Sequence, residues 1–383
     1  MASEERGLKV WLLCSGVGIM NRGIESFFRE CFDGLHPLAK SAGIQLELIK
    51  GRGAEGEDEH RVWCLPRTGF IARWTGKLTG RSGYAVEQMS SLPGIIRQIR
   101  RRRPEVILYS DPDMARWLHR LRGRIGVGFR MIYSNGAPMK APFGSCEHVQ
   151  QVAPFYLQEA LEAGEDPERQ SLVPYGIGVP ASDIRFDPED RLRARGELGL
   201  PLDRRIVLSV GWISAYHKRM DYLIDEIAGL AAPRPYLVML GAMDERTPPI
   251  LRQAKEKLGE ENFTARSVPY EQVRRYYDAA DVFSLCSLRE GFGRVYLEAL
   301  IHGLPCAVHD HAVMRWVLGS EGSFADFSRA GNLTKLLGEL LAREPTSEAM
   351  TRRRQSVRER FAWESLAPGY FEMFRKTAGQ SLR

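Results

Sequence analysis

In Glu290-Gly-Phe-Gly-Arg-Val-Tyr-Leu-Glu298, two carboxylates flank a turn that contains two glycines. The residues before it, 281–288, form a short apolar run that is typical of a buried strand in a parallel sheet. The residues after it, 294–302, have the pattern of a helix, which we expect to end at Gly303 because Pro305 lies just beyond. The stretch therefore predicts a strand, a glycine turn and a helix, the unit from which parallel α/β sheets are built.

The amino end of this expected helix is a candidate anion site. Unpaired backbone N–H groups and the helix dipole favour negative charge there. We expect Glu290 at the strand end and Glu298 on the second helical turn, both facing one crevice. Phosphate on the amides with hydroxyls on the carboxylates fits a nucleotide sugar. A plain strand–turn–helix joint with two solvated glutamates is the alternative, and the spacing alone does not exclude it.

Strand and helix patterns alternate along the whole chain. Expected strands cover 8–14, 44–49, 105–109, 129–133, 205–210, 236–240, 263–268, 282–287 and 305–309. Expected helices cover 22–39, 91–103, 114–121, 147–163, 220–230, 249–258, 270–280 and 294–302. This alternation predicts parallel sheets with helices on both faces, and 383 residues are enough for two such α/β domains.

The domain boundary is expected in Val173-Pro-Tyr-Gly-Ile-Gly-Val-Pro180, which is rich in turn residues. We place an N-terminal domain at 1–176 and a C-terminal domain at 177–365; the family resemblance described below implies that the first is the acceptor side and that the second binds the nucleotide sugar. Ligands of doubly wound sheets bind beyond the carboxyl ends of the strands. If the two sets of strand ends face each other, the site is the cleft between the domains. Residues 51–84 are glycine-rich and basic without regular periodicity, and such a long loop is either functional or disordered.

The composition is that of an ordinary globular protein, with 44 % hydrophobic and 27 % charged residues. A net charge of +6 suits an anionic ligand or a membrane surface, and also many proteins that bind neither. Six scattered cysteines without C-x-x-C or metal spacing predict a reduced, cytoplasmic chain with no metal site. No run approaches the ~20 apolar residues of a membrane-spanning helix, and no signal-peptide core is evident.

A second candidate phosphate loop follows the expected strand at 205–210. Gly211 ends the strand, and Lys218 and Arg219 stand before the helix that begins at Met220. Cations at a helix amino end are unfavourable because they oppose the helix dipole. A diphosphate bound between them and the Glu290 loop would offset this unfavourable interaction. Solvated surface cations are the alternative.

A glycine turn also follows the first expected strand, at Gly16 and Gly18. A dinucleotide fingerprint would need a third glycine at position 21, where the chain has Asn21. This weakens the hypothesis of a dinucleotide-dependent oxidoreductase.

Taken in order, these motifs resemble the retaining, nucleotide-sugar-dependent glycosyltransferases of family four. The resemblance runs over nearly the whole chain, and its segments are Arg22-Gly-Ile-Glu-Ser-Phe-Phe28, 173–177, 210–212, 217–224, 276–283, 290–293, 297–300 and Phe361-Ala-Trp-Glu-Ser365. It implies the GT-B architecture, in which two doubly wound Rossmann-like domains face each other across a cleft. It also implies that a last helix, at about 366–383, crosses back to the N-terminal domain.

The resemblance implies a role for each matched residue. Lys218 would bind the donor diphosphate, Glu290 the transferred sugar and Glu298 the ribose hydroxyls. The other residues implied at the donor are Gly16, Gly18, Gly211, Arg219, Val268, Tyr270, Phe292, Gly293, Arg294 and Val295.

Two positions depart from the family's pattern. Trp212 stands where members often have arginine, and we expect His217 or Arg219 to supply the charge. Where many members place a histidine facing the donor sugar, this chain has Tyr109-Ser-Asp-Pro-Asp113, so Asp111 is the candidate there. A cap on the following helix is the alternative role for Asp111.

The implied activity is a metal-independent, hexosyltransferase-type transfer with retention, and its candidate catalytic residues are Lys218, Glu290 and Asp111. We expect a UDP- or GDP-sugar donor, no separate cofactor and no metal, including at His309-Asp-His311. The acceptor stays open between a saccharide, a lipid-linked carrier and a natural product. A catalytically silent GT-B nucleotide-binding protein is the second hypothesis, and the oxidoreductase is the third.

Two arginine-rich segments, 95–103 and 351–360, are expected to be solvated helical faces. For 95–103, contact with anionic lipid headgroups is the alternative, which would place the protein at the inner face of a membrane. No nucleic-acid motif accompanies either segment.

Overall fold

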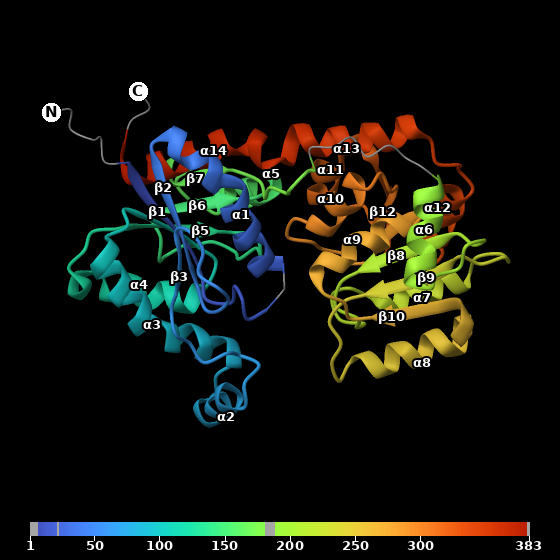
Figure 1. Cartoon of the computed structure of the whole chain (residues 1–383), viewed down its shortest axis with the longest axis horizontal. Helices are drawn as coiled ribbons and strands as arrows, with labels where there is room; N and C mark the ends of the chain where they lie inside the picture. Colours follow the sequence, from blue (N-terminus) through green and yellow to red (C-terminus); the bar gives the residue numbers. More distant parts are fainter. Residues whose placement is uncertain (1–6, 21–22, 181–187, 381–383) are drawn as a thin grey trace. The chain divides into compact units, whose positions relative to one another are not determined.

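The computed structural model describes residues 7–20, 23–180 and 188–380. The chain divides into two compact units, one of Met1–Gly178 with Phe361–Arg383 and one of Val179–Arg360 (Figure 1). The sequence analysis placed the corresponding boundaries after residue 176 and near residue 365. Asn21 and Arg22, used above to judge the glycine turn and the start of the first helix, lie outside the described residues.

The N-terminal unit is built on a seven-stranded parallel sheet in the order β3-β2-β1-β4-β5-β6-β7. Its strands are β1 (Leu8–Cys14), β2 (Ile44–Lys50), β3 (Glu59–Arg61), β4 (Val106–Tyr109), β5 (Arg130–Ser134), β6 (His148–Gln151) and β7 (Gln170–Leu172). Its helices are α1 (Gly23–Ala39), α2 (Phe70–Thr79), α3 (Gly83–Arg102), α4 (Pro112–Ile125), α5 (Pro154–Glu162) and α14 (Trp363–Ala378). Because side chains alternate along a strand, β1, β4 and β5 pack one row of apolar residues on α3 and α4 and leave the other face for α1 and α14.

The C-terminal unit is built on a six-stranded parallel sheet in the order β10-β9-β8-β11-β12-β13. Its strands are β8 (Ile206–Val210), β9 (Tyr236–Leu240), β10 (Phe263–Arg266), β11 (Val282–Leu285), β12 (Cys306–His309) and β13 (Gly322–Ala325). Its helices are α6 (Pro188–Leu198), α7 (Met220–Ala228), α8 (Thr247–Leu258), α9 (Tyr270–Ala279), α10 (Arg294–Ile301), α11 (Ala312–Leu318), α12 (Asn332–Leu341) and α13 (Ser347–Phe361).

Both sheets have the same strand order, in which the first strand of the unit lies beside its second and fourth strands. The order of strands therefore reverses between β1 and β4 and again between β8 and β11. Open α/β sheets bind ligands at the carboxyl ends of the strands that flank such a reversal. The expected fold class, two doubly wound Rossmann-like domains, is confirmed.

One expected helix, 147–163, is wrong in its first part, where the chain forms β6, and only Pro154–Glu162 is helical. This strand was missed because two of its buried residues are glutamines, so it lacks the apolar pattern of a buried strand. Gln150 Nε2 donates to Val173 O at 2.9 Å, and Gln151 Nε2 donates to Gln170 Oε1 at 2.9 Å. Pro154 at the first turn then fixes where the helix begins.

Residues 51–84 are not an irregular loop, since they contain β3 and α2. The helix expected at 91–103 also begins earlier than its apolar periodicity indicates. Ser82 caps it by accepting a hydrogen bond from Ala85 N at 3.1 Å.

The last helix, α14, belongs to the N-terminal unit, as the resemblance implied. Trp363 at its start packs against two glycines: a Cβ on Gly34 of α1 would lie 2.1 Å from Trp363 Cγ, and one on Gly176 would lie 2.5 Å from Trp363 Cε3. Next to it, Ile177 and Ala362 form a parallel bridge. The segments 173–177 and 361–365, far apart in the sequence, therefore form one joint.

Candidate functional site

The two candidate phosphate loops are brought together at the β8/β11 reversal. Lys218 comes from the loop after β8, and Glu290 comes from the loop after β11. Lys218 Nζ donates to Glu290 Oε1 at 2.6 Å, and the two side chains are only 21 % and 10 % exposed. The structure thus brings a cation and a carboxylate from distant segments together at the same end of the sheet.

The backbone around Lys218 is held in an uncommon conformation. His217 and Arg219 have φ of 59° and 49°, in the left-handed region that non-glycine residues rarely adopt. Each such residue costs on the order of 1 kcal/mol or more, a cost that tends to persist at functional sites. The result places the Lys218 side chain over Gly211, where a Cβ would lie 3.3 Å from Lys218 Cγ. Burial and the Lys218 charge lower the pKa of His217, which favours a neutral imidazole.

Glu298 on α10 is held by two tyrosines from α9. Tyr277 Oη donates to Glu298 Oε2 at 2.9 Å, and Tyr270 Oη donates to Glu298 Oε1 at 3.4 Å. Burial and the nearby carboxylate raise the pKa of Tyr277, so its phenol stays protonated and able to donate. Tyr277 was not among the residues expected from the sequence, although it lies in the segment 276–283. Val268 lies in the loop between β10 and α9.

The glycine turn before α10 is shaped by the protein's own packing. Gly293 is the N-cap of α10 with φ 75°, and a Cβ there would lie 2.9 Å from Met314 Cε. Phe292 is buried, and its ring makes an edge-type contact with Trp316 at 6.5 Å between centroids. Arg294 is the first residue of α10 and is buried, and Val295 O accepts from Tyr277 Oη at 3.3 Å. Residues 292–295 therefore form the turn and the amino end of α10, as the strand–turn–helix pattern predicts.

Arg246 is a cation beside Trp212, with its guanidinium 4.9 Å from a ring centroid of that tryptophan. Arg219 instead donates to Phe327 O at 2.8 Å and stacks 4.3 Å from the Tyr222 ring. Arg246 precedes α8 and carries no local motif, so sequence reasoning did not find it.

In the N-terminal unit, the strand order reverses between β1 and β4, and Asp111 lies two residues after the end of β4. Asp111 is buried, accepts a hydrogen bond from Tyr84 Oη and lies 3.5 Å from Ser15 Oγ. It is the N-cap residue of α4, yet its side chain makes no capping bond. Burial raises the pKa of Asp111 to about 6, although the Tyr84 hydrogen bond acts in the opposite direction.

A buried ion-pair network lies next to Asp111. Arg67 Nη1 lies 3.0 Å from Glu25 Oε1, and Arg67 Nη2 lies 2.6 Å from Glu87 Oε1. The Arg67 guanidinium also stacks 4.1 Å from the Tyr84 ring. Arg67 thereby joins the 51–84 segment to α1 and α3.

Gly16 and Gly18 are required by this network and by the neighbouring turn. A Cβ on Gly16 would lie 2.4 Å from Glu25 Oε1 and 2.7 Å from Arg67 Nη2. Gly18 has φ 80°, and its Cβ would lie 2.2 Å from Arg52 O. The geometry thus explains both glycines through internal packing.

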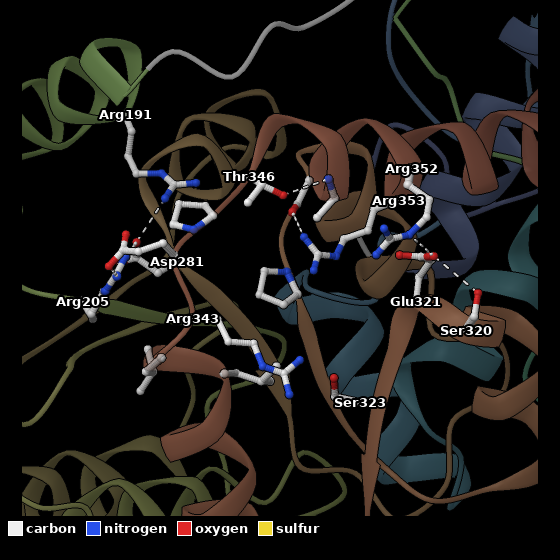
Figure 2. Close-up of a pocket in the computed structure, with 17 residues that line it drawn as sticks. Arg191, Arg205, Asp281, Ser320, Glu321, Ser323, Arg343, Thr346, Arg352 and Arg353 are labelled. Atoms are coloured by element: carbon white, nitrogen blue, oxygen red, sulfur yellow. Dashed lines mark hydrogen bonds and ion pairs between the residues drawn. The ribbon is translucent and has the colours of Figure 1, made fainter.

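A cavity of about 260 Å³ lies at the opposite end of the C-terminal sheet (Figure 2). Asp281 there pairs with Arg191 at 3.1 Å and with Arg205 at 3.4 Å, and Arg352 pairs with Glu321 at 2.9 Å. These residues precede or flank the amino ends of the strands, where open α/β sheets do not usually bind ligands. The carboxyl-end constellation around Lys218 is the better candidate.

The His309-Asp-His311 segment has structural partners for both rings. His309 Nδ1 accepts from Phe327 N at 3.0 Å, and His311 Nδ1 accepts from Val313 N at the start of α11 at 3.3 Å. Within residues 7–20, 23–180 and 188–380, no group of three or more His, Cys, Asp or Glu side chains is placed to hold a metal ion.

Comparison with known proteins adds two kinds of evidence. Residues 190–357 match the model of the family described as "Glycosyl transferases group 1". The chain is 30 % identical over 237 residues to a D-inositol 3-phosphate glycosyltransferase of Geodermatophilus obscurus, covering 57 % of this chain and 51 % of that protein. The Mycobacterium tuberculosis protein of the same name is 28 % identical over 233 residues, covering 57 % and 46 %. The chain spans about half the length of the curated relatives it matches.

Among solved structures, the fold is similar to sucrose-phosphate synthase from Thermosynechococcus elongatus, with a TM-score of 0.76, 17 % identity and coverage of 96 % of this chain and 98 % of that one. It is also similar to Anabaena Alr3699/HepE in complex with UDP-glucose, with a TM-score of 0.71, 14 % identity and coverage of 95 % and 98 %. At these identities the likeness shows the fold, which is GT-B.

Proposed function

Because residues 190–357 match the family model of the group 1 glycosyl transferases, we propose that the protein belongs to this family and transfers a sugar from a nucleotide diphosphate sugar to an acceptor hydroxyl. The observation that carries the proposal is the Lys218–Glu290 pair at the β8/β11 reversal. It places one cation and one carboxylate beside the amino end of α10, where a diphosphate and a hydroxyl-bearing sugar find complementary partners.

Lys218 and the backbone amides at the start of α10 bind the diphosphate and stabilise the negative charge that develops as it leaves. Such preorganised donors lower the barrier electrostatically, without a covalent intermediate on the protein. Glu290 accepts hydrogen bonds from hydroxyls of the transferred sugar. Glu298, oriented by Tyr277 at 2.9 Å, accepts those of the ribose.

The finer parts of the proposal are a hexosyl group, retention of configuration, and catalysis without a metal or a separate cofactor. Asp111 is proposed as the third catalytic residue, since its buried carboxylate lies just after the carboxyl end of β4 in the N-terminal unit. A UDP-sugar is the preferred donor over a GDP-sugar because a structure of similar fold holds UDP-glucose.

The acceptor is proposed to be a hydroxyl of a saccharide, a lipid-linked carrier or a small natural product. The curated relatives are named for an inositol phosphate acceptor, which adds a polyol phosphate to the acceptors to be tested. All six cysteines are buried and unbridged, which fits the cytoplasmic location that we propose.

Thermal shift with UDP, GDP, ADP and TDP, each with and without an attached sugar, tests the donor site. We expect one base to raise the melting temperature by several degrees, and Glu298→Ala to abolish most of that shift. Glu339→Ala, on the exposed face of α12, is the matched control and keeps the shift. Stabilisation by none of the nucleotides in a well-folded protein would contradict the proposal, while binding without release of free nucleoside diphosphate would favour a silent binding protein.

A further inference from the structure

Helix α2 exposes its large apolar side chains and buries its small ones. Between 56 % and 81 % of each of four large side chains is exposed, and these are Phe70, Ile71, Trp74 and Leu78. The residues that α2 buries are Ala72 and Gly76. A surface helix of a globular protein normally does the reverse.

The two faces of α2 lie on opposite sides of the helix. At about 100° per residue, the four exposed apolar side chains fall within an arc of about 100°. Ala72 and Gly76 are centred about 170° from the middle of that arc. They pack toward the start of α3, where a Cβ on Gly76 would lie 2.6 Å from Arg81 O (Figure 1). The apolar arc is therefore directed away from the N-terminal unit's own core.

The charges around this arc are all positive. Residues 60–86 contain no aspartate or glutamate. Arg73 and Lys77 flank the apolar arc on one side, and both are exposed, as is Arg81 just after the helix. Arg67 is the exception, because Glu25 and Glu87 neutralise it inside the unit.

We propose that α2 is a membrane-surface anchor, which inserts Phe70, Ile71, Trp74 and Leu78 into the interface of an anionic lipid bilayer. Tryptophan and phenylalanine with leucine on one face and lysine or arginine at its border are the composition of an interfacial helix. Anionic headgroups attract the bordering cations, and the absence of carboxylates removes the repulsion that such a surface would otherwise exert. In the described part of the chain no helix is long and apolar enough to cross a membrane.

The arginine-rich end of α3 is less suited to this role, because two of its arginines already have partners within the unit. Arg100 donates to Ile125 O at 3.2 Å and to Arg124 O at 3.0 Å, and Arg102 pairs with Glu47 at 3.4 Å. The inference goes beyond the proposed function and does not depend on which sugar is transferred.

Co-sedimentation of the full chain with vesicles tests the anchor, using phosphatidylcholine alone and phosphatidylcholine with about 30 % phosphatidylglycerol. We expect binding to the anionic vesicles to be at least tenfold tighter and to weaken in high salt, since screening shortens electrostatic attraction. The double variant F70S/W74S should bind at least tenfold more weakly than the wild type, and R73Q/K77Q should lose most of the preference for anionic vesicles. L202S is the matched control, because Leu202 is 54 % exposed in the other unit, and it should bind as the wild type does.

Circular dichroism and melting temperature should show that all variants remain folded, since the changed side chains are exposed. The proposal is overturned if the folded wild type binds neither vesicle, or if F70S/W74S binds as tightly as the wild type. It is also overturned if the wild type is a dimer in solution that F70S/W74S turns into a monomer while vesicle binding is absent, since a second copy would then cover α2.

Discussion

Lys218 Nζ and Glu290 Oε1 lie 2.6 Å apart, so the residue assigned to the diphosphate and the residue assigned to the sugar neutralise each other. Both side chains are largely shielded from water, which makes the loss of either partner more costly than at an exposed pair. A bound diphosphate offers Lys218 a second anionic partner, and a sugar hydroxyl offers Glu290 a donor. The pair therefore holds the two loops ready for an anion with an attached sugar.

Replacing Lys218 with alanine should weaken binding of the cognate nucleoside diphosphate about 10- to 100-fold, the equivalent of about 1.4–3 kcal/mol. The variant loses the cation and leaves Glu290 facing the phosphates. Isothermal titration calorimetry measures the effect. Lys218→Arg should keep part of the affinity, and Lys257→Ala, at an exposed pair with Asp225, should keep all of it. Equal affinities of Lys218→Ala and wild type would remove Lys218 from the donor site.

Tyr277→Phe should reduce nucleotide affinity by about 3- to 10-fold, the scale of a typical hydrogen bond, which contributes about 0.5–1.5 kcal/mol net. The phenol orients Glu298 at 2.9 Å without being assigned a contact to the donor. The loss should be much smaller with a 2′-deoxy nucleotide, because Glu298 then has less ribose to bind. Tyr276→Phe, whose phenol meets Arg266 at 3.2 Å, is the control. An equal loss with both nucleotides would mean that Tyr277 acts on folding rather than on the ribose.

The sequence predicts the elements around the proposed donor site well because local signals agree there. The apolar run before Glu290 and the glycines after it specify β11, the turn and α10, and the end of β8 at Gly211 follows in the same way. Glu298 could be placed on its helix, but Tyr277 and Arg246 could not be assigned to the site. Their partners lie on other elements, and no periodicity indicates such contacts.

The N-terminal unit was less predictable because its polar residues are buried. The β6 strand contains Gln150 and Gln151, whose Nε2 groups donate to β7 and the segment after it rather than to water. Arg67 was grouped with the basic residues of an irregular loop, whereas it lies in an ion-pair network with Glu25 and Glu87. The sequence alone does not distinguish a buried, paired arginine from a solvated one, because the partners that a buried charge requires lie elsewhere in the chain.

Asp111→Asn should make the protein more stable and less active at pH 8. The folded-state pKa of Asp111 is raised from 3.8 to about 6, so burying the ionised form costs about 3 kcal/mol above pH 6 and nothing below the unfolded value. The gain in melting temperature should therefore be large at pH 8 and vanish near pH 4. Thermal denaturation at both values, with a turnover assay at pH 8, measures the two effects. Unchanged turnover would remove Asp111 from the catalytic residues.

His148→Gln should protect the protein against mild acid. Burial, with the charges of Lys376 and Arg169, lowers the pKa of His148 from 6.5 to about 4. The unfolded chain therefore takes up a proton first, and stability is lost as the pH falls from 6.5 toward 4, by up to about 3 kcal/mol. The melting temperature of the variant, relative to that of the wild type, should be higher at pH 5 than at pH 7.5. Equal changes in the melting temperatures of variant and wild type between pH 7.5 and pH 5 would show that His148 does not limit the stability in acid.

Gly34→Ala should destabilise the N-terminal unit, because the joint between its first and last helices has no room for a methyl group. The new Cβ would lie 2.1 Å from Trp363 Cγ, and relieving that overlap must move α14 away from α1, at a cost of about 1–3 kcal/mol or more. Gly123→Ala is the matched control, since Gly123 is also helical and its Cβ would meet nothing within 4 Å. Alanine there should stabilise α4 by about 0.5–1 kcal/mol. Chemical denaturation of both variants compares the opposite signs, and equal stabilities would show that Trp363 yields without loss and that α14 is not fixed by this contact.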